Sequence, residues 1–112
     1  FGDAFFFSPD GNLSCATAAN VFVQLGRNIV TPPVNDGALP GVMRNWILAQ
    51  GRIGGFAVSE RSVSRSDVLA ADRVFLTNSL RLFQPVSGFE RTHYEPSLPD
   101  GCEALRSQLT GR

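Results

Sequence analysis

Lysine is absent from this chain, and all ten of its basic residues are arginine. A cofactor that reacts through a lysine Schiff base therefore has no covalent partner within these residues. Ten acidic residues balance the arginines, so the chain has no net charge and no basic patch that would attract a polyanion. We expect neither nucleic acid nor a membrane surface as a partner.

Other residues that carry chemistry are also scarce. The only histidine, His93, lies in a polar tail without the serine and carboxylate of a catalytic triad. Cys15 and Cys102 are far apart and lack the spacing of metal ligands, which predicts reduced thiols in a cytoplasmic protein and no metal site. No apolar run in the sequence approaches the roughly 20 residues that a membrane-spanning helix needs.

The composition suffices for one modest hydrophobic core, because 43% of the 112 residues are hydrophobic. The chain begins with Phe1 instead of methionine and runs almost at once into the apolar residues 4–7. We therefore expect residues 1–112 to be a single domain cut from a larger protein. An apolar strand at a severed end also needs a partner to cover it.

Turn residues and apolar periodicity divide the chain into strands and short helices. The strands are expected at 4–8, 12–16, 20–24, 28–31, 56–63, 73–77 and 80–86. The helices are expected at 42–50, within 64–71 and at 98–109, after a loop-like tail at 93–100. Because these elements mix without strict alternation, we expect an α/β or mixed α+β fold, in which β-hairpins form a mixed sheet or a partial barrel with flanking helices.

The loop 36–44 has the form of a phosphate-binding segment. Pro40 and Gly41 stop the preceding chain, and Val42 opens an apolar run with helical spacing that Gly51 can end. The backbone N–H groups of Val42 and Met43 should then lie free at a helix N-terminus, which attracts anions. A plain loop leading into a helix is the alternative interpretation of the same spacing.

Two further segments favour ligand binding, and each has a simpler explanation. The elbow Thr77-Asn78-Ser79 follows a strand and offers two hydroxyls and an amide to phosphate oxygens, although a strand-ending turn would look the same. The small residues 14–20 would let backbone or a flat ring approach closely. They would also simply permit tight sheet packing.

The order of these segments resembles the C-terminal domain of the class IV, fold-type IV aminotransferases, which use pyridoxal phosphate. The resemblance rests on residues 12–22, 31–33, 37–44, 69–80 and 85–86 and extends over about residues 3–90. Within that family, Asn78-Ser79-Leu80 and Gly41-Val42-Met43-Arg44 look most like the aminodeoxychorismate lyases. The resemblance implies the large domain of the D-amino-acid aminotransferase-like fold, with an N-terminal domain that carries the Schiff-base lysine upstream.

The resemblance also implies a set of residues around the cofactor. The amides of Val42 and Met43 and the side chain of Ser79 would hold the phosphate, while Asn20 would lie beneath the cofactor. The full cofactor-binding set implied by the resemblance is Val42, Met43, Ser79, Cys15, Asn20, Asn78 and Arg44. No catalytic residue is expected in this chain, because the lysine is missing.

Cys15 departs from the family pattern, which has a glutamate five residues before the asparagine equivalent to Asn20. That carboxylate keeps the pyridine nitrogen protonated, and a thiol is a poor substitute because burial raises its pKa further above neutrality. Strong carbanion stabilisation is therefore not expected from Cys15.

As a whole, the resemblance implies an enzyme that releases pyruvate from aminodeoxychorismate and forms 4-aminobenzoate, a folate precursor. It implies a homodimer, an N-terminal domain as a partner, and an amino acid or aminodeoxychorismate as the small-molecule substrate. The isolated chain should be inactive. The alternative is a non-catalytic module of the same fold that binds another anion or a partner subunit, which the change at Cys15 favours.

Overall fold

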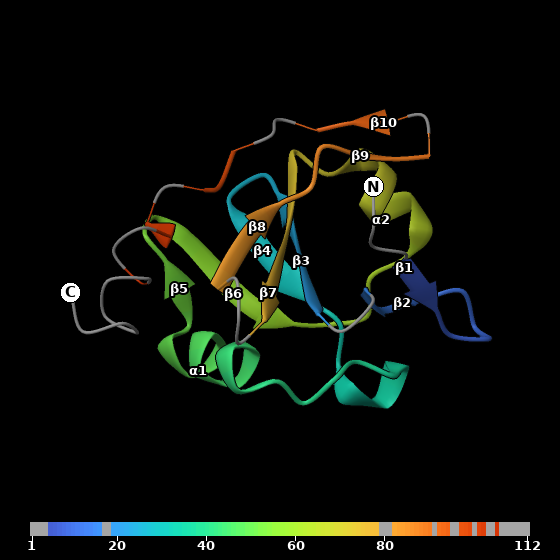
Figure 1. Cartoon of the computed structure of the whole chain (residues 1–112), viewed down its shortest axis with the longest axis horizontal. Coiled ribbons are helices and arrows are strands. Elements are labelled where there is room, and N and C mark those ends of the chain that lie inside the picture. The colour runs from blue at the N-terminus through green and yellow to red at the C-terminus, as the bar shows by residue number, and fades with distance from the viewer. Residues whose placement is uncertain are drawn as a thin grey trace.

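A curled mixed sheet forms the centre of the computed structural model (Figure 1). The structure describes residues 5–16, 19–78, 82–90, 92–94, 97–99, 101–102 and 105. Within these residues the central sheet has six strands in the order β5-β6-β4-β3-β7-β8, and only β4 and β6 pair in parallel. The strands are β1 (Phe5–Phe7), β2 (Leu13–Ala16), β3 (Asn20–Leu25), β4 (Asn28–Thr31), β5 (Arg52–Ile53), β6 (Phe56–Glu60), β7 (Arg73–Asn78), β8 (Leu82–Pro85), β9 (Gly88–Phe89) and β10 (Thr92–His93). The helices are the 3₁₀ turn η1 (Val34–Asp36), α1 (Val42–Gln50) and α2 (Arg65–Ala70).

Each face of the central sheet packs against its own hydrophobic cluster. Phe22 of β3 and Phe75 of β7 share one cluster with Met43 and Ile47 of α1. The alternate residues of the same strands face α2 and the β1–β2 hairpin, in a cluster that contains Val21, Val23, Val74, Leu76 and Val68. Because both faces are covered, residues 21–23 of β3 and 74–76 of β7 are continuous apolar runs instead of alternating ones.

The structure confirms most of the predicted elements and the mixed fold class. The 4–8 and 12–16 strands form the β1–β2 hairpin, 20–24 and 28–31 form β3 and β4, and α1 has the predicted bounds. Gly51 ends α1 with a left-handed φ of 75° and donates its N–H to the Ile47 carbonyl.

Several boundaries differ from the prediction. The strand expected at 56–63 ends at Glu60, and the two-residue strands β5, β9 and β10 were not predicted, because so short a strand has no readable alternation. The tail expected to be loop-like therefore begins with His93 inside β10. Of the expected terminal helix, Cys102 and Leu105 are buried against the α1 side of the sheet, while residues 100, 103–104 and 106–109 lie outside the described residues.

Helix α2 begins with the capping box that the sequence predicted. The Ser64 hydroxyl accepts a hydrogen bond from the Asp67 N–H at 3.1 Å, and the Asp67 carboxylate accepts one from the Ser64 N–H at 3.0 Å. Arg61 also donates to Asp67, at 3.1 Å. The hydrogen bond from the Ser64 backbone, together with the neighbouring Arg61 guanidinium, lowers the pKa of Asp67.

The Asp67→Asn variant is expected to lose about 0.5–1 kcal/mol of unfolding free energy near neutral pH, because the amide keeps the shape of the capping box without its charge. The folded-state pKa of Asp67 lies below its unfolded value of 3.8, so the charge stabilises the fold above that value. This contribution is lost as the pH falls through the folded-state pKa. Urea unfolding of both proteins at pH 7, 5 and 3 should show the difference shrinking at pH 3; a difference that is constant with pH would contradict the assignment.

Candidate functional site

The start of α1 is an uncapped helix N-terminus. Gly41 occupies the N-cap position in an extended conformation, with φ of −68° and ψ of 148°, and supplies no side-chain cap. The first turn has no acidic residue, and no described group accepts a hydrogen bond from the N–H of Val42, Met43 or Arg44. Val42 is 84% exposed, so this end is accessible. Three free N–H groups at the positive end of a helix dipole favour an anion.

Asn20, the first residue of β3, holds the loop that leads into α1. Its side chain is buried, and its amide donates a hydrogen bond of 2.7 Å to the Leu39 carbonyl. Gly41 passes so close to Asn20 that a Cβ on Gly41 would lie 2.3 Å from Asn20 Oδ1. The glycine is therefore required by close approach to a fixed polar side chain.

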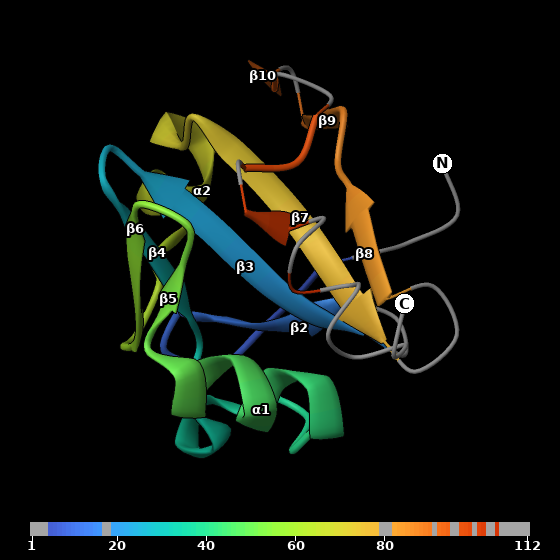
Figure 2. The same cartoon turned by 90° about the vertical axis from the view of Figure 1, so that its left-hand side faces the viewer.

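Thr77 lies directly across from Asn20, as its register partner on β7. The residue is 2% exposed, and its hydroxyl is buried without a hydrogen-bond partner among the described residues. Two residues earlier, Phe75 packs with Met43 and Ile47 of α1, so strand alternation aims Thr77 at the same side of the sheet. Figure 2 shows the carboxyl end of β7 beside the first turn of α1, and these two elements are in contact.

Sequence reasoning offered the Thr77 hydroxyl as one of the two hydroxyls of the elbow 77–79 but did not include Thr77 in the cofactor-binding set. It gave the phosphate-binding role to Ser79, which lies outside the described residues. Asn78 is the last residue of β7, and alternation places it on the face opposite to Thr77. The predicted roles of Ser79 and Asn78 remain predictions. The available signal for Thr77 was a hydroxyl that directly follows the apolar residues 74–76 of the strand.

Arg44 points into the protein and fixes α1 to the sheet. The residue is 3% exposed, and its guanidinium donates to the Pro32 carbonyl at 3.1 Å and to Asn45 Oδ1 at 2.9 Å. It also forms an ion pair with the Glu60 carboxylate at the end of β6. These contacts hold the first turn of α1 in place, while the predicted contact of Arg44 with a cofactor remains a prediction.

Cys15 lies in the middle of β2, where it is half-buried opposite Phe6 of β1. Burial raises the pKa of the Cys15 thiol, so the thiol is protonated and uncharged at neutral pH. The neighbouring Ser14 donates its hydroxyl hydrogen to the Asp36 carbonyl, which joins β2 to the loop before α1. Ser14 thus connects β2 to this loop, while both interpretations of the small residues 14–20 remain predictions.

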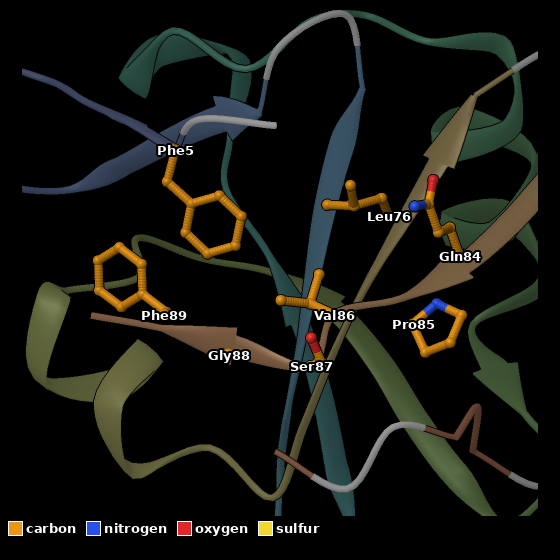
Figure 3. Close-up of a pocket in the computed structure, with 8 residues that line it drawn as sticks. All are labelled: Phe5, Leu76, Gln84, Pro85, Val86, Ser87, Gly88 and Phe89. Atoms are coloured by element: carbon orange, nitrogen blue, oxygen red, sulfur yellow. The ribbon is translucent and has the colours of Figure 1, made fainter. Parts of the chain in front are cut away.

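A separate pocket lies on the opposite face of the sheet (Figure 3). Its wall includes Phe5 and Phe89, whose rings stack with centroids 5.0 Å apart. The lining residues are Phe5, Leu76, Gln84, Pro85, Val86, Ser87, Gly88 and Phe89. None of them is charged, and none belongs to the predicted cofactor set, so this pocket does not provide the anion site.

The described residues form neither a cluster that could hold a metal ion nor a helix that could span a membrane. No group of three or more histidine, cysteine, aspartate or glutamate residues could hold a metal ion in that part of the chain. The helices that the structure describes are all too short or too polar to cross a bilayer.

Comparison with known proteins identifies the family. The family model described as amino-transferase class IV matches residues 1–89, and the chain belongs to this family. The class IV aminotransferases and their related lyases depend on pyridoxal phosphate.

Three relatives show how far the similarity extends. The chloroplastic branched-chain-amino-acid aminotransferase 2 of Arabidopsis thaliana is 34% identical over 100 residues, which are 86% of this chain and 26% of the plant protein. A crystal structure from Legionella pneumophila, provisionally named 4-amino-4-deoxychorismate lyase, is 32% identical with a TM-score of 0.86, over 95% of this chain and 40% of that one. The branched-chain aminotransferase of Thermobaculum terrenum, solved in its PLP form, is 25% identical with a TM-score of 0.86, over 98% of this chain and 38% of that one. The chain thus spans between a quarter and two fifths of the length of these relatives.

Proposed function

We propose that this chain is the part of a pyridoxal-phosphate-dependent class IV enzyme that holds the phosphate of the cofactor. The observation that carries the proposal is the start of α1, where Gly41 leaves three N–H groups without acceptors in the described part of the chain, beside the buried side chain of Asn20. A phosphate group fits such a site, because it brings negative charge to the positive end of a helix and accepts several hydrogen bonds. When bound, pyridoxal phosphate supplies an electron sink for the reacting carbon of an amino acid.

Some residues of this chain would bind the phosphate, and others would hold the binding site in place. Val42 and Met43 donate their backbone N–H groups, and Asn20 keeps the preceding loop in place through its bond to Leu39. Arg44 anchors the helix by its contacts with Pro32 and Glu60. The thiol of Cys15 is uncharged and cannot replace a carboxylate beside a pyridinium nitrogen, so the ring would withdraw electrons less strongly than in a glutamate-containing relative.

The covalent part of the reaction belongs to other residues of the complete protein. This chain has no lysine, so the proposal includes an N-terminal domain that carries one, and a homodimer that covers the apolar β1 edge. The short coverage of each relative, 26% of the plant enzyme for example, supports this part of the proposal.

For the reaction itself we favour a lyase that releases pyruvate from aminodeoxychorismate and leaves 4-aminobenzoate. The support is the 32% identity to the Legionella protein over 95% of this chain, together with the sequence Asn78-Ser79-Leu80. The second candidate is a branched-chain aminotransferase, which the 34% identity to the Arabidopsis enzyme favours. The complete protein distinguishes them: a lyase releases pyruvate from aminodeoxychorismate without an added 2-oxo acid, whereas an aminotransferase needs a 2-oxo acid to consume valine or leucine.

Binding by the 112-residue chain itself tests the phosphate site. The only tryptophan, Trp46, lies one turn beyond Val42 in α1, so its fluorescence should fall when pyridoxal phosphate binds. We expect pyridoxal, which lacks the phosphate, to bind at least tenfold more weakly, since it loses hydrogen bonds to a charged group. Inorganic phosphate should compete with pyridoxal phosphate. Equal affinity for pyridoxal and its phosphate would refute the site.

The same experiments address the non-catalytic alternative. A module that has kept the fold but lost the reaction would bind pyridoxal phosphate or inorganic phosphate at α1, while the complete protein neither released pyruvate nor transferred an amino group. Borohydride treatment of this chain with pyridoxal phosphate should trap no side-chain adduct, because the chain has no lysine. A trapped adduct at an internal residue would contradict the assignment of the covalent step to another domain.

A further inference from the structure

We propose that the hydroxyl of Thr77 is a further donor to the phosphate held at the start of α1. The inference rests on the proposed function and adds to it a side chain from the sheet that the cofactor-binding set implied by the resemblance does not contain. The site would then have two walls: the first turn of α1 and the carboxyl end of β7 (Figure 2).

The position of Thr77 follows from its neighbours in the sheet. It pairs with Asn20 on one side and with Phe83 on the other. Asn20 reaches the entry loop of α1 through its bond to Leu39, and Phe83 packs in the same cluster as Met43. Both partners of Thr77 therefore face α1, and Thr77 shares that face.

The hydroxyl of Thr77 is in an unusual state for a buried group. Most buried hydroxyls have a hydrogen-bond partner, and a buried hydroxyl without a partner destabilises the fold. Asn20, the register partner of Thr77, donates its amide N–H to Leu39 at 2.7 Å, and its Oδ1 accepts no hydrogen bond from Thr77. The Thr77 hydroxyl is therefore a hydrogen-bond donor without an acceptor among the described residues. It lies beside the start of α1, where the first N–H groups also lack described acceptors.

An anion can accept hydrogen bonds from the Thr77 hydroxyl and from the free N–H groups of α1 at the same time. A phosphate accepts hydrogen bonds from N–H and O–H donors, and bonds to a charged acceptor are about twice as strong as neutral ones. A cation would be repelled by the helix end, and an apolar group would leave the hydroxyl unpaired. The unpaired Thr77 hydroxyl and the free N–H groups of α1 thus define the ligand as a phosphate-sized anion.

The test compares the Thr77→Val and Thr77→Ser variants with the unchanged chain. Valine keeps the shape of threonine and removes the hydroxyl, whereas serine keeps the hydroxyl. We expect Thr77→Val to weaken the binding of pyridoxal phosphate and of inorganic phosphate about tenfold, as measured by Trp46 fluorescence and by competition, and to leave pyridoxal binding unchanged. Thr77→Ser should retain affinity within about threefold.

A second readout separates binding from folding. Without ligand, Thr77→Val should melt at the same temperature as the unchanged chain or higher, because it removes an unpaired buried hydroxyl. If that variant does not fold, the Thr77→Ala and Thr77→Ser pair gives the same comparison, since it differs only by the hydroxyl.

The outcomes distinguish this inference from the proposed function. If the unchanged chain does not discriminate between pyridoxal phosphate and pyridoxal, the phosphate site itself is wrong. If it does discriminate, and removal of the hydroxyl leaves phosphate affinity unchanged, the phosphate site stands and the role of Thr77 is overturned.

Discussion

Replacing Phe75 with alanine is expected to lower the free energy of unfolding by about 3–5 kcal/mol. The ring is completely buried, stacks on Phe22 with centroids 5.2 Å apart, and meets Phe83 at 5.9 Å. Alanine would remove these aromatic contacts and leave a cavity that the sheet and α1 cannot close. A domain of this size is stable by about 5–15 kcal/mol, so the variant would lose a large share of its stability.

Phe75 also connects the core to the candidate site. It packs beneath Met43 and Ile47 of α1, and it lies two residues before Thr77 on the same face of the sheet. Loss of the ring should therefore loosen α1 as well as destabilise the fold, and phosphate affinity should fall together with stability.

Urea unfolding followed by Trp46 fluorescence measures this effect. Phe6→Ala is the matched control, because Phe6 is 51% exposed on β1 and its loss should cost less than about 1 kcal/mol. If the two variants lost similar amounts of unfolding free energy, Phe75 would not be a main contributor to the hydrophobic cluster between α1 and the sheet.

Features that depend on neighbouring residues were predictable from the sequence. The bounds of α1 follow from Gly41 before it and Gly51 after it, and the capping box of α2 follows from Ser64 and Asp67. The free N–H groups of the site were predicted for the same reason, since every helix start leaves them unpaired. The point where a helix begins, and the free N–H groups of its first turn, depend on residues that are close together in the sequence.

Features that depend on distant pairing could not be predicted in this way. The parallel pairing of β4 with β6 brings Glu60 to the first turn of α1, where its carboxylate pairs with the buried guanidinium of Arg44. The pairing of β3 with β7 likewise brings Thr77 opposite Asn20, 57 positions earlier in the chain. One shift of register would move Thr77 to the other face of the sheet, so its role depends on an alignment that no short sequence pattern encodes.

Replacing Gly41 with alanine is expected to weaken pyridoxal phosphate binding at least tenfold and to cost about 1–2 kcal/mol of stability. The backbone itself would tolerate alanine, because φ is −68° and ψ is 148°. The new Cβ would instead lie 2.3 Å from Asn20 Oδ1. Asn20 would have to turn away and give up its bond to Leu39, and the first turn of α1 would shift with the loop.

A double-mutant cycle tests this cause directly. In the Asn20→Ala background the colliding atom is absent, so adding Gly41→Ala should cost much less stability and affinity than it does alone, with a coupling of about 1 kcal/mol or more. Gly55→Ala is the matched control, because its Cβ would meet only the Arg27 guanidinium, at an ordinary 3.6 Å, and its φ lies outside the left-handed region. Additive costs for Gly41→Ala and Asn20→Ala would contradict the collision. Coupled costs would establish that the loop entering α1 and the first residue of β3 act as one unit in presenting the N–H groups of the helix.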